Sequence, residues 1–443
     1  MSDDCEQPRR PRLLLLAYAC SPARGSEGGV GWHRALQAAR FCDTWVLCQD
    51  GLMGDEIRRH LAEHGPIPGL TFVFVAKSPP LQFLMRFPGL YYGGLNIWHR
   101  WAYAAAVRLH AEVKFDLAHL VNLCTFREPG YLWKLGIPHV WGSWGGTNEY
   151  PWRFLGVAGF TGAAVEVARS LVNRVQFRFG PRVRRAARAG PVVVTNTLAQ
   201  QDFTRVHGLP SELVPCNGIS RVADRSREWS GSGQPLRILW SGEIRPIKAL
   251  PLLLAALAKM PPEVPWEARI LGQGRSRAKC ERMAKRLGIA DRITWTGWLP
   301  HAEALQQFAW ADAFVHTSLR DTFPTVILEA MASGTPVVCL DHQGMRDVVT
   351  PACGVKLPVT TPARVATDLA ATLADLTRDP ARWEELSRGA VERAGRVPLV
   401  AARRRDGRDL QPRPRARRRR ARADTGGTPL DHRRPRGGRR LKF

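Results

Sequence analysis

The chain has 443 residues, more than one hydrophobic core usually serves, so two domains are expected. Hydrophobic residues make up 44% of the chain, and no apolar run approaches the roughly 20 residues that span a bilayer. The formal net charge is +26, but residues 401–443 alone hold 17 Lys and Arg against 4 Asp, which is half of the excess. The composition therefore excludes a membrane-spanning class and confines the strongest basic character to one tail.

The first residues predict a buried strand rather than an export signal. The apolar run from Leu13 to Cys20 is short and follows the acidic segment 2–6. We expect residues 1–10 to be disordered. Nine cysteines are scattered without a C-x-x-C pair or a metal-ligand cluster, which is typical of a reducing compartment. The sequence therefore predicts a cytoplasmic protein without a bound metal.

Strand-like runs alternate with helical patterns along the first half of the chain, as they do in parallel α/β layers. A strand is expected at 12–20, a glycine-rich loop at 21–31 and a helix from near Trp32. Further strands are expected at 44–49, 70–76, 115–121, 138–144, 191–197 and 212–219. Together they predict one Rossmann-like domain over residues 11–219.

A second series follows a polar linker, residues 220–235, which is rich in Gly, Ser and Pro. Strands are expected at 236–244, 267–274, 292–299, 313–318 and 336–341, with a helix at 250–260. They predict a second Rossmann-like domain over 236–395. The expected fold is α/β: two doubly wound domains face across a cleft, and ligands bind outside the carboxyl ends of the strands.

One helix of the second series carries an unusual carboxylate. Glu329 is the only charged residue between Thr322 and Pro336, in a segment that is apolar on nearly all sides. Thr322 to Thr325 resemble a helix start, and Gly334 with Pro336 marks its end. The amino end of this helix is a natural seat for phosphate. Asp321 and Glu329 are then placed to accept hydrogen bonds from ligand hydroxyls, or Glu329 is satisfied by its own neighbours.

Several segments together resemble retaining GT-B glycosyltransferases, specifically glycosyltransferase family 4. The resemblance covers about residues 11–395 and rests on an acid, Asp321, eight residues before Glu329 and on the following motifs. These are "GSEGGVGW" (25–32), "LVPCNGI" (213–219), "LWSGEIRPIKALPLLLAAL" (239–257), "RITWTGWLP" (292–300) and "LEAMASGTPVV" (328–338). The resemblance implies a GT-B fold and transfer of a sugar from a nucleotide-diphosphate sugar.

The resemblance also implies roles for single residues. Glu329 would grip ribose hydroxyls, Asp321 would contact the transferred sugar, and Lys248 would bind the diphosphate. Further donor contacts are implied at Gly28, Gly29, Gly242, Trp298, Leu299, Phe323, Thr325 and Val326. The leaving phosphate itself would assist the acceptor in a metal-independent, hexosyltransferase-type reaction. No protein nucleophile is implied.

Some positions depart from the family pattern. Glu243 stands where the family commonly has a second cation, so Arg245 is the candidate substitute. Pro324 lacks the N–H that the usual glycine would offer to phosphate. On the acceptor side, His119 matches the first of two family histidines. Asn122 and Arg127 are comparable acceptor candidates, and a structural role for each of these three residues stays open.

The segment 167–190 holds seven arginines and no acid, with Leu171, Val175 and Phe179 at four-residue spacing. This pattern suits docking on an anionic membrane surface, although a merely solvated face fits equally well. It indicates a cytoplasmic enzyme that lies peripherally on the inner face of the plasma membrane.

The sequence thus predicts a glycosyltransferase that acts on a glycan or lipid-linked acceptor in cell-surface or exopolysaccharide synthesis. The alternatives are a catalytically silent nucleotide-sugar-binding protein and a GT-B sugar-nucleotide epimerase. The basic tail, 396–443, has no helical or strand period and no aromatic residue before Phe443. We expect this tail to be disordered and not to bind nucleic acid. A shifted reading frame would explain its arginine-rich sequence.

Overall fold

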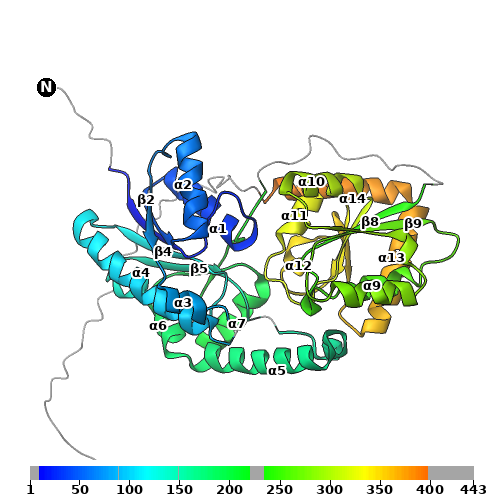
Figure 1. Cartoon of the computed structure of the whole chain (residues 1–443), viewed down its shortest axis with the longest axis horizontal. Coiled ribbons are helices and arrows are strands. Elements are labelled where there is room, and N and C mark those ends of the chain that lie inside the picture. Colours follow the sequence, from blue (N-terminus) through cyan, green and yellow to red (C-terminus); the bar gives the residue numbers. More distant parts are fainter. Residues whose placement is uncertain (1–8, 88, 148, 220–233, 398–443) are drawn as a thin grey trace, which may run out of the picture. The chain divides into compact units, whose positions relative to one another are not determined.

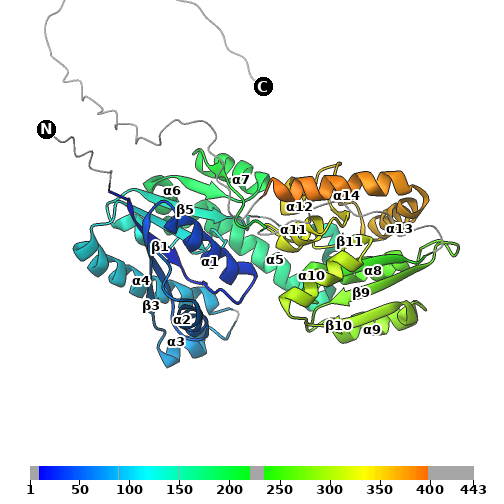
Figure 2. The same ribbon diagram turned by 90° about the horizontal axis from the view of Figure 1, so that it is seen from above.

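The structure is a computed structural model that describes residues 9–87, 89–147, 149–219 and 234–397. The chain divides into two compact units, 1–401 and 402–443, of which the second lies outside the described residues. The expectations for the first eight residues, for most of the 220–235 linker and for nearly all of the tail also fall outside them. All elements below belong to the first unit (Figures 1 and 2).

The first half of the chain builds a seven-stranded parallel sheet. Its strands are β1 (Arg12–Ala17), β2 (Asp43–Gln49), β3 (Leu70–Val75), β4 (Leu117–Asn122), β5 (His139–Trp144), β6 (Val192–Val194) and β7 (Glu212–Leu213). The helices are α1 (Ser26–Ala39), α2 (Leu52–His64), α3 (Pro79–Leu84), α4 (Tyr91–Val113), α5 (Leu155–Phe179), α6 (Pro181–Ala189) and α7 (Thr197–His207). The strand order is β3-β2-β1-β4-β5-β6-β7, so the sheet reverses direction of growth between β1 and β4.

The second half repeats this plan with six parallel strands. They are β8 (Leu236–Ser241), β9 (Trp266–Leu271), β10 (Ile293–Gly297), β11 (Ala313–His316), β12 (Val337–Leu340) and β13 (Gly354–Leu357). The helices are α8 (Leu250–Leu257), α9 (Arg277–Arg286), α10 (His301–Trp310), α11 (Thr325–Ala332), α12 (Gln343–Val348), α13 (Pro362–Arg378) and α14 (Pro380–Gly395). The order β10-β9-β8-β11-β12-β13 places the equivalent switch between β8 and β11.

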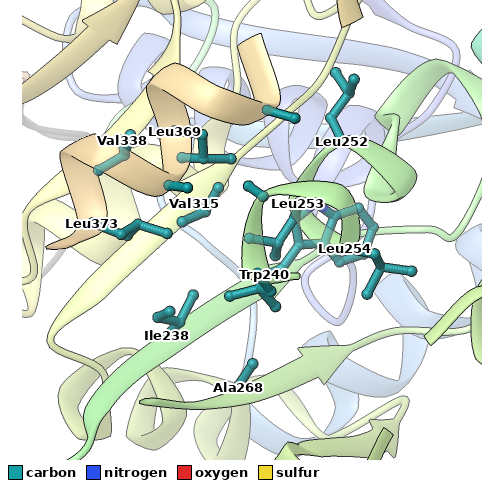
Figure 3. Packing of buried hydrophobic residues seen from close by; sticks show 14 of the residues in the cluster. Ile238, Trp240, Leu252, Leu253, Leu254, Ala268, Val315, Val338, Leu369 and Leu373 are labelled. Carbon is teal, nitrogen blue, oxygen red and sulfur yellow. The ribbon is translucent and has the colours of Figure 1, made fainter. Parts of the chain in front are cut away.

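Each sheet is covered on both faces, because alternate residues of its central strand point to opposite sides. In β8, Ile238 and Trp240 join the core under α8 and α13, while Leu239 joins the core under α11 and α14. Figure 3 shows the first of these cores, where Trp240 packs beside Leu253 and Leu254. The apolar strands that the sequence predicts are therefore buried on two faces.

The predicted strands are confirmed, but three local expectations change. Helix α1 begins at Ser26, so most of the expected glycine loop is already helical. The glycines permit a close approach there: a Cβ on Gly31 would lie 2.1 Å from the Ala19 carbonyl oxygen. The sequence interpretation also missed β13, which is only four residues long. No side chain caps α11, whose N-cap is Pro324.

Helix α5 belongs to neither core alone. Tyr150, Phe154 and Ala158, at and before its start, pack into the core of the second sheet, and Phe177 near its end packs into that of the first. The segment Trp152–Phe179 is also long and apolar enough to cross a membrane by length and composition, with 11% of its most apolar window buried. The expectation that no segment could reach that length was wrong, although one such helix is weak evidence for a span.

Candidate active site

The second sheet presents two loops at its switch point, where ligands of doubly wound sheets bind. The loop after β8 ends in a short 3₁₀ turn, Pro246–Lys248, which places Lys248 at the carboxyl edge. The loop after β11 runs from Thr317 to Pro324 and carries Asp321. The hydroxyl of Thr317 donates to the Lys248 carbonyl oxygen at 2.7 Å, which ties the two loops together.

Lys248, Asp321 and His316 form a charged cluster at this edge. The Lys248 ammonium forms an ion pair with Asp321 Oδ2, and His316 Nε2 donates to the same oxygen at 3.3 Å. Burial opposes ionisation of Asp321, but Lys248 and His316 outweigh it and hold the pKa of Asp321 well below its ordinary value. Burial lowers the pKa of His316, so its ring stays neutral near pH 7. The cluster therefore presents an ionised carboxylate paired with a lysine.

Glu329 lies one turn inside α11, and its side chain is 15% exposed. His301 Nε2, at the start of α10, donates to Glu329 Oε1 at 3.1 Å. The His301 side chain is exposed, and the hydrogen bond raises its pKa. Glu329 is thus held by a displaceable surface partner rather than by a buried arginine, and a ligand hydroxyl can take the place of His301.

The first sheet contributes a carboxylate that the sequence interpretation missed. Glu27 lies in the first turn of α1, and the backbone N–H of Cys124 donates to its two oxygens at 3.0 and 3.2 Å. Burial raises the pKa of Glu27, although the Cys124 N–H lowers it. Glu27 is the only carboxylate within the glycine motif 25–32, and that signal could have found it.

A cavity of about 240 Å³ brings Glu27 and Asp321 together. Its lining comes from both halves of the chain: Glu27, Val30, Cys124, Gly146, Arg169, Cys216, Arg320, Asp321, Thr322, Phe323 and Thr325. The backbone at Gly145 lies close to the Thr322 side chain, since a Cβ on Gly145 would lie 2.0 Å from the Thr322 methyl group. Asn196 Nδ2 donates to the Thr322 carbonyl oxygen at 3.0 Å, and Asn217 Nδ2 donates to the Thr325 hydroxyl at 3.3 Å. The loop that carries Asp321 is therefore fixed from the other sheet.

The remaining predicted donor contacts lie in different places, and only some of them line the cavity. Phe323 and Thr325 line the cavity, whereas Gly28 and Gly29 flank Glu27 within α1. Gly242 follows β8 with a φ of +153°, in the backbone region that favours glycine. Outside the cavity, Trp298 is exposed, while Leu299 and Val326 are half-buried against the core beneath α11.

Arg245, the expected substitute for a second cation, does not reach the cavity lining. Its guanidinium lies 3.2 Å from the Glu243 carboxylate, and both side chains are exposed. Glu243, which stands where the family commonly has a cation, is therefore also the ion-pair partner of Arg245, the proposed substitute. Of Lys248 and Arg245, both in the loop after β8, Lys248 is thus the one that pairs with Asp321.

The acceptor-side candidates have structural partners. His119 lies within β4 and donates through Nε2 to the Gly142 carbonyl oxygen, and burial and the nearby Arg34 lower its pKa to about 3. Asn122 is buried and bonds the Ala19 backbone at both its amide and its carbonyl. It also donates to the Glu27 carbonyl oxygen at 2.9 Å. Arg127 lies over the Tyr92 ring and donates to Gln176 at 3.3 Å.

The seven arginines of 167–190 separate into distinct environments. Arg174 pairs with Glu149 and Arg182 pairs with the buried Glu128, while burial lowers the pKa of Arg182 to about 10. Arg169 lines the cavity. The exposed members without an ion pair among the described residues are Arg178, Arg184, Arg185 and Arg188. Leu171, Val175 and Phe179 are all exposed, as docking on a surface would require.

Comparison with known proteins agrees with this architecture. Residues 223–393 match the family model described as glycosyl transferases group 1. A D-inositol 3-phosphate glycosyltransferase of Thermomonospora curvata is 34% identical over 193 residues, which are 41% of this chain and 44% of that protein. A GDP-mannose-dependent alpha-mannosyltransferase of Mycobacterium tuberculosis is 32% identical over 188 residues, or 41% and 46%. The chain thus spans about half of the length of these relatives.

The structural comparison extends over most of the chain. The crystal structure of Anabaena HepE in complex with UDP has a TM-score of 0.59 at 19% identity, and the match covers 88% of this chain and 96% of that one. At this identity the likeness shows the fold. The chain therefore has the GT-B fold, and the sequence of its residues 223–393 is similar to the glycosyl transferases group 1 family.

Proposed function

We propose that this protein is a retaining glycosyltransferase that moves a hexose from a nucleotide-diphosphate sugar to a glycan or lipid-linked acceptor. The observation that carries the proposal is the cluster of Lys248 and Asp321 at the switch point, with Glu329 one turn inside the helix that follows. This places a cation, a paired carboxylate and a carboxylate with an exposed histidine partner in adjoining segments of the second sheet. The family match and the UDP complex of a GT-B neighbour support a nucleotide-sugar donor.

The proposed reaction uses these groups in order. The donor ribose replaces His301 on Glu329, and the diphosphate lies at Lys248 and at the amino end of α11, which no side chain caps. Asp321 accepts hydrogen bonds from the transferred sugar. As the glycosidic bond breaks, Lys248 and the helix dipole stabilise the charge that develops on the leaving diphosphate. We propose that no metal is required, since these groups supply the positive charge.

The acceptor enters from the first sheet in this proposal. Glu27 lines the same cavity as Asp321. A second cavity, of about 480 Å³, opens at the carboxyl ends of β2 and β3, where Arg24 and Lys77 line it. The exposed arginines and apolar residues of α5 and α6 would keep a cytoplasmic enzyme against an anionic membrane that holds a lipid-linked acceptor.

The test begins with donor binding. Thermal-shift measurements against UDP, GDP, ADP and their sugar conjugates should identify a nucleotide that stabilises the protein by about 2.7 kcal/mol at a concentration 100 times its Kd. Transfer from that donor is then measured with membrane extracts and defined glycans, and the anomeric configuration of the product is read by NMR. Transfer with inversion would contradict the retaining assignment, and activity that EDTA abolishes would contradict metal independence.

A catalytically silent nucleotide-sugar-binding protein is the second candidate. The Arg245–Glu243 pair favours it, because a cation that would assist the leaving group is neutralised. Tight donor binding without hydrolysis or transfer would select this candidate. Restored turnover in Glu243→Lys would then identify the missing charge as the cause.

A further inference from the structure

Arg169 lies on the inner face of α5, most of which is exposed. The nearest buried residues of the helix are Glu166, one turn before it, and Asn173, one turn after it. Residues at these spacings share one face of a helix. Arg169 accordingly lines the 240 Å³ cavity together with Asp321 and Thr322, although it comes from a different half of the chain. Its position therefore differs from that of the exposed arginines nearby.

The Arg169 side chain lacks a partner in the part of the chain that the structure describes. Its Nε is buried and makes no hydrogen bond. Glu166, the carboxylate one turn away, is instead paired with Arg320. Buried polar atoms are almost always hydrogen-bonded, and a buried charge without a partner is strongly destabilising. An unbonded guanidinium nitrogen at a cavity wall therefore indicates a missing anion.

The neighbourhood of Arg169 is also too positive. Burial and, after it, the charge of Arg169 lower the pKa of Arg320 to about 10. Burial lowers the pKa of Arg127 as well, and Arg169 again adds to the effect. Arg169 thus repels the guanidinium groups of both Arg320 and Arg127. Glu166, the carboxylate one turn away on α5, is already paired with Arg320.

We propose that Arg169 binds a phosphate group inside this cavity. The planar guanidinium matches phosphate in a bidentate geometry, and a phosphate carries enough charge to relieve the repulsion. The start of α11, an eight-residue helix, opens onto the same cavity at Thr322, Phe323 and Thr325. The adjacent Asp321 does not repel the anion strongly, because Lys248 is paired with it.

Two sources can supply this phosphate, and the proposal rests on the proposed function in both cases. One source is the diphosphate of the sugar donor. Arg169 would then provide the second positive charge that Glu243 and its partner Arg245 do not deliver. The other source is a phosphate carried by the acceptor. The shared chemistry is a phosphate ester or diphosphate held between α5 and the loop that carries Asp321.

The experiment compares Arg169→Gln with the parent full-length chain. The control is Arg153→Gln, which changes an exposed arginine just before α5 that lies outside the cavity lining. Calorimetry measures the affinities for UDP and GDP and for the matching nucleosides. It then measures the affinity for inorganic phosphate while the protein is saturated with whichever of UDP and GDP binds more tightly. If the donor is the source, Arg169→Gln weakens diphosphate binding at least tenfold and leaves nucleoside binding within twofold.

If the acceptor is the source, diphosphate affinity stays constant and inorganic phosphate binding falls at least tenfold in Arg169→Gln. Either result supports the proposal, provided that Arg153→Gln behaves as the parent does. Unchanged affinities for both probes in Arg169→Gln would overturn it. A parent that binds inorganic phosphate through Arg169 but no nucleotide would instead contradict the proposed function alone.

A folding control keeps the result interpretable. Removal of an uncompensated charge should leave the unfolding temperature of ligand-free Arg169→Gln equal to or above that of the parent. Should Arg169→Gln fail to fold, Arg169→Lys retains the charge but loses the planar fork. Its phosphate affinity should then fall at least threefold, and an unchanged affinity in that variant would count against the proposal.

Discussion

The Lys248 ammonium and the Asp321 carboxylate form an ion pair across 73 residues of sequence. It joins the loop after β8 to the loop after β11, which are neighbours only because the sheet switches direction between these strands. With no donor bound, the carboxylate holds the lysine at the edge where a diphosphate would lie. In the proposed reaction, Lys248 would contact the diphosphate while it keeps its ion pair with Asp321.

Lys248→Ala should lower kcat more than it weakens donor affinity, because the cation mainly stabilises the leaving diphosphate. A fall of about 100-fold in kcat corresponds to roughly 2.7 kcal/mol of lost stabilisation. Steady-state kinetics and calorimetry with the donor separate the two quantities. Lys285→Ala, an exposed lysine of α9, is the control. A raised KM with an unchanged kcat would assign Lys248 to ground-state binding.

Asp321→Asn should remove a contribution to stability that is present at neutral pH and lost in acid. The folded pKa of Asp321 lies below its ordinary value, so its contribution is present above the unfolded pKa of about 3.9 and is lost as the pH falls toward the folded pKa. The parent should therefore be more stable than Asp321→Asn at pH 7, and the difference should shrink below about pH 4. Urea unfolding at a series of pH values measures this. A difference that is constant from pH 7 to pH 3 would contradict the assignment.

Glu329→Gln should weaken nucleotide-sugar binding by about 1.5–3 kcal/mol, the contribution of a charge-assisted hydrogen bond. The fold should be unaffected. If UDP, GDP and ADP bind equally well to Glu329→Gln and to the parent, the ribose role is wrong.

His301 adds a pH dependence to the same contact. Its hydrogen bond to Glu329 raises its pKa, so protonated His301 competes with ribose for the carboxylate. Affinity for a nucleotide-sugar, whose diphosphate diester does not titrate here, should rise as the pH passes above the ordinary histidine value of about 6.5. In His301→Gln, calorimetry between pH 6 and pH 8 should give a flatter profile. Parallel profiles would show that His301 does not compete.

Asn122→Ala should destabilise the fold by roughly 2–4 kcal/mol, because it leaves buried backbone groups of Ala19 and the Glu27 carbonyl oxygen without partners. Asn173→Ala is the comparison, since Asn173 is also buried but its Oδ1 makes no hydrogen bond among the described residues. Its loss of stability should be smaller. Chemical denaturation measures both. Normal stability of Asn122→Ala with impaired acceptor use would instead support the acceptor role.

Arg178, Arg184, Arg185 and Arg188 changed together to Glu should reduce binding to vesicles that contain anionic lipid. Each basic residue near such a surface contributes about 1 kcal/mol. Arg182 is excluded from this set because its guanidinium is paired with the buried Glu128. The matched control changes four exposed basic residues in and beside α9: Arg275, Arg282, Lys285 and Arg286. Equal sedimentation of both variants with vesicles would leave α5 and α6 as an ordinary solvated surface.

Much of the fold could be predicted from the sequence, because buried parallel strands need apolar residues on both faces. Leu13 to Ala17 and Leu236 to Trp240 show this directly, as alternate residues fill opposite cores. The short strand β13 escaped notice, since four residues carry too little pattern. The start of α1 was placed too late, because glycines that usually indicate a loop here permit a close helix–strand contact.

The sequence by itself determined the helix that carries Glu329 and the position of Asp321 before it. It also determined the loop after β8 that carries Lys248. Each of these features depends on local spacing. Only the tertiary structure decided which of these charges meet. Asp321 pairs with Lys248, Glu329 turns to His301, and Arg245 is taken by Glu243. It also brought Glu27 and Arg169 to one cavity. Such pairings depend on distances between segments far apart in the chain, and no local period records those distances.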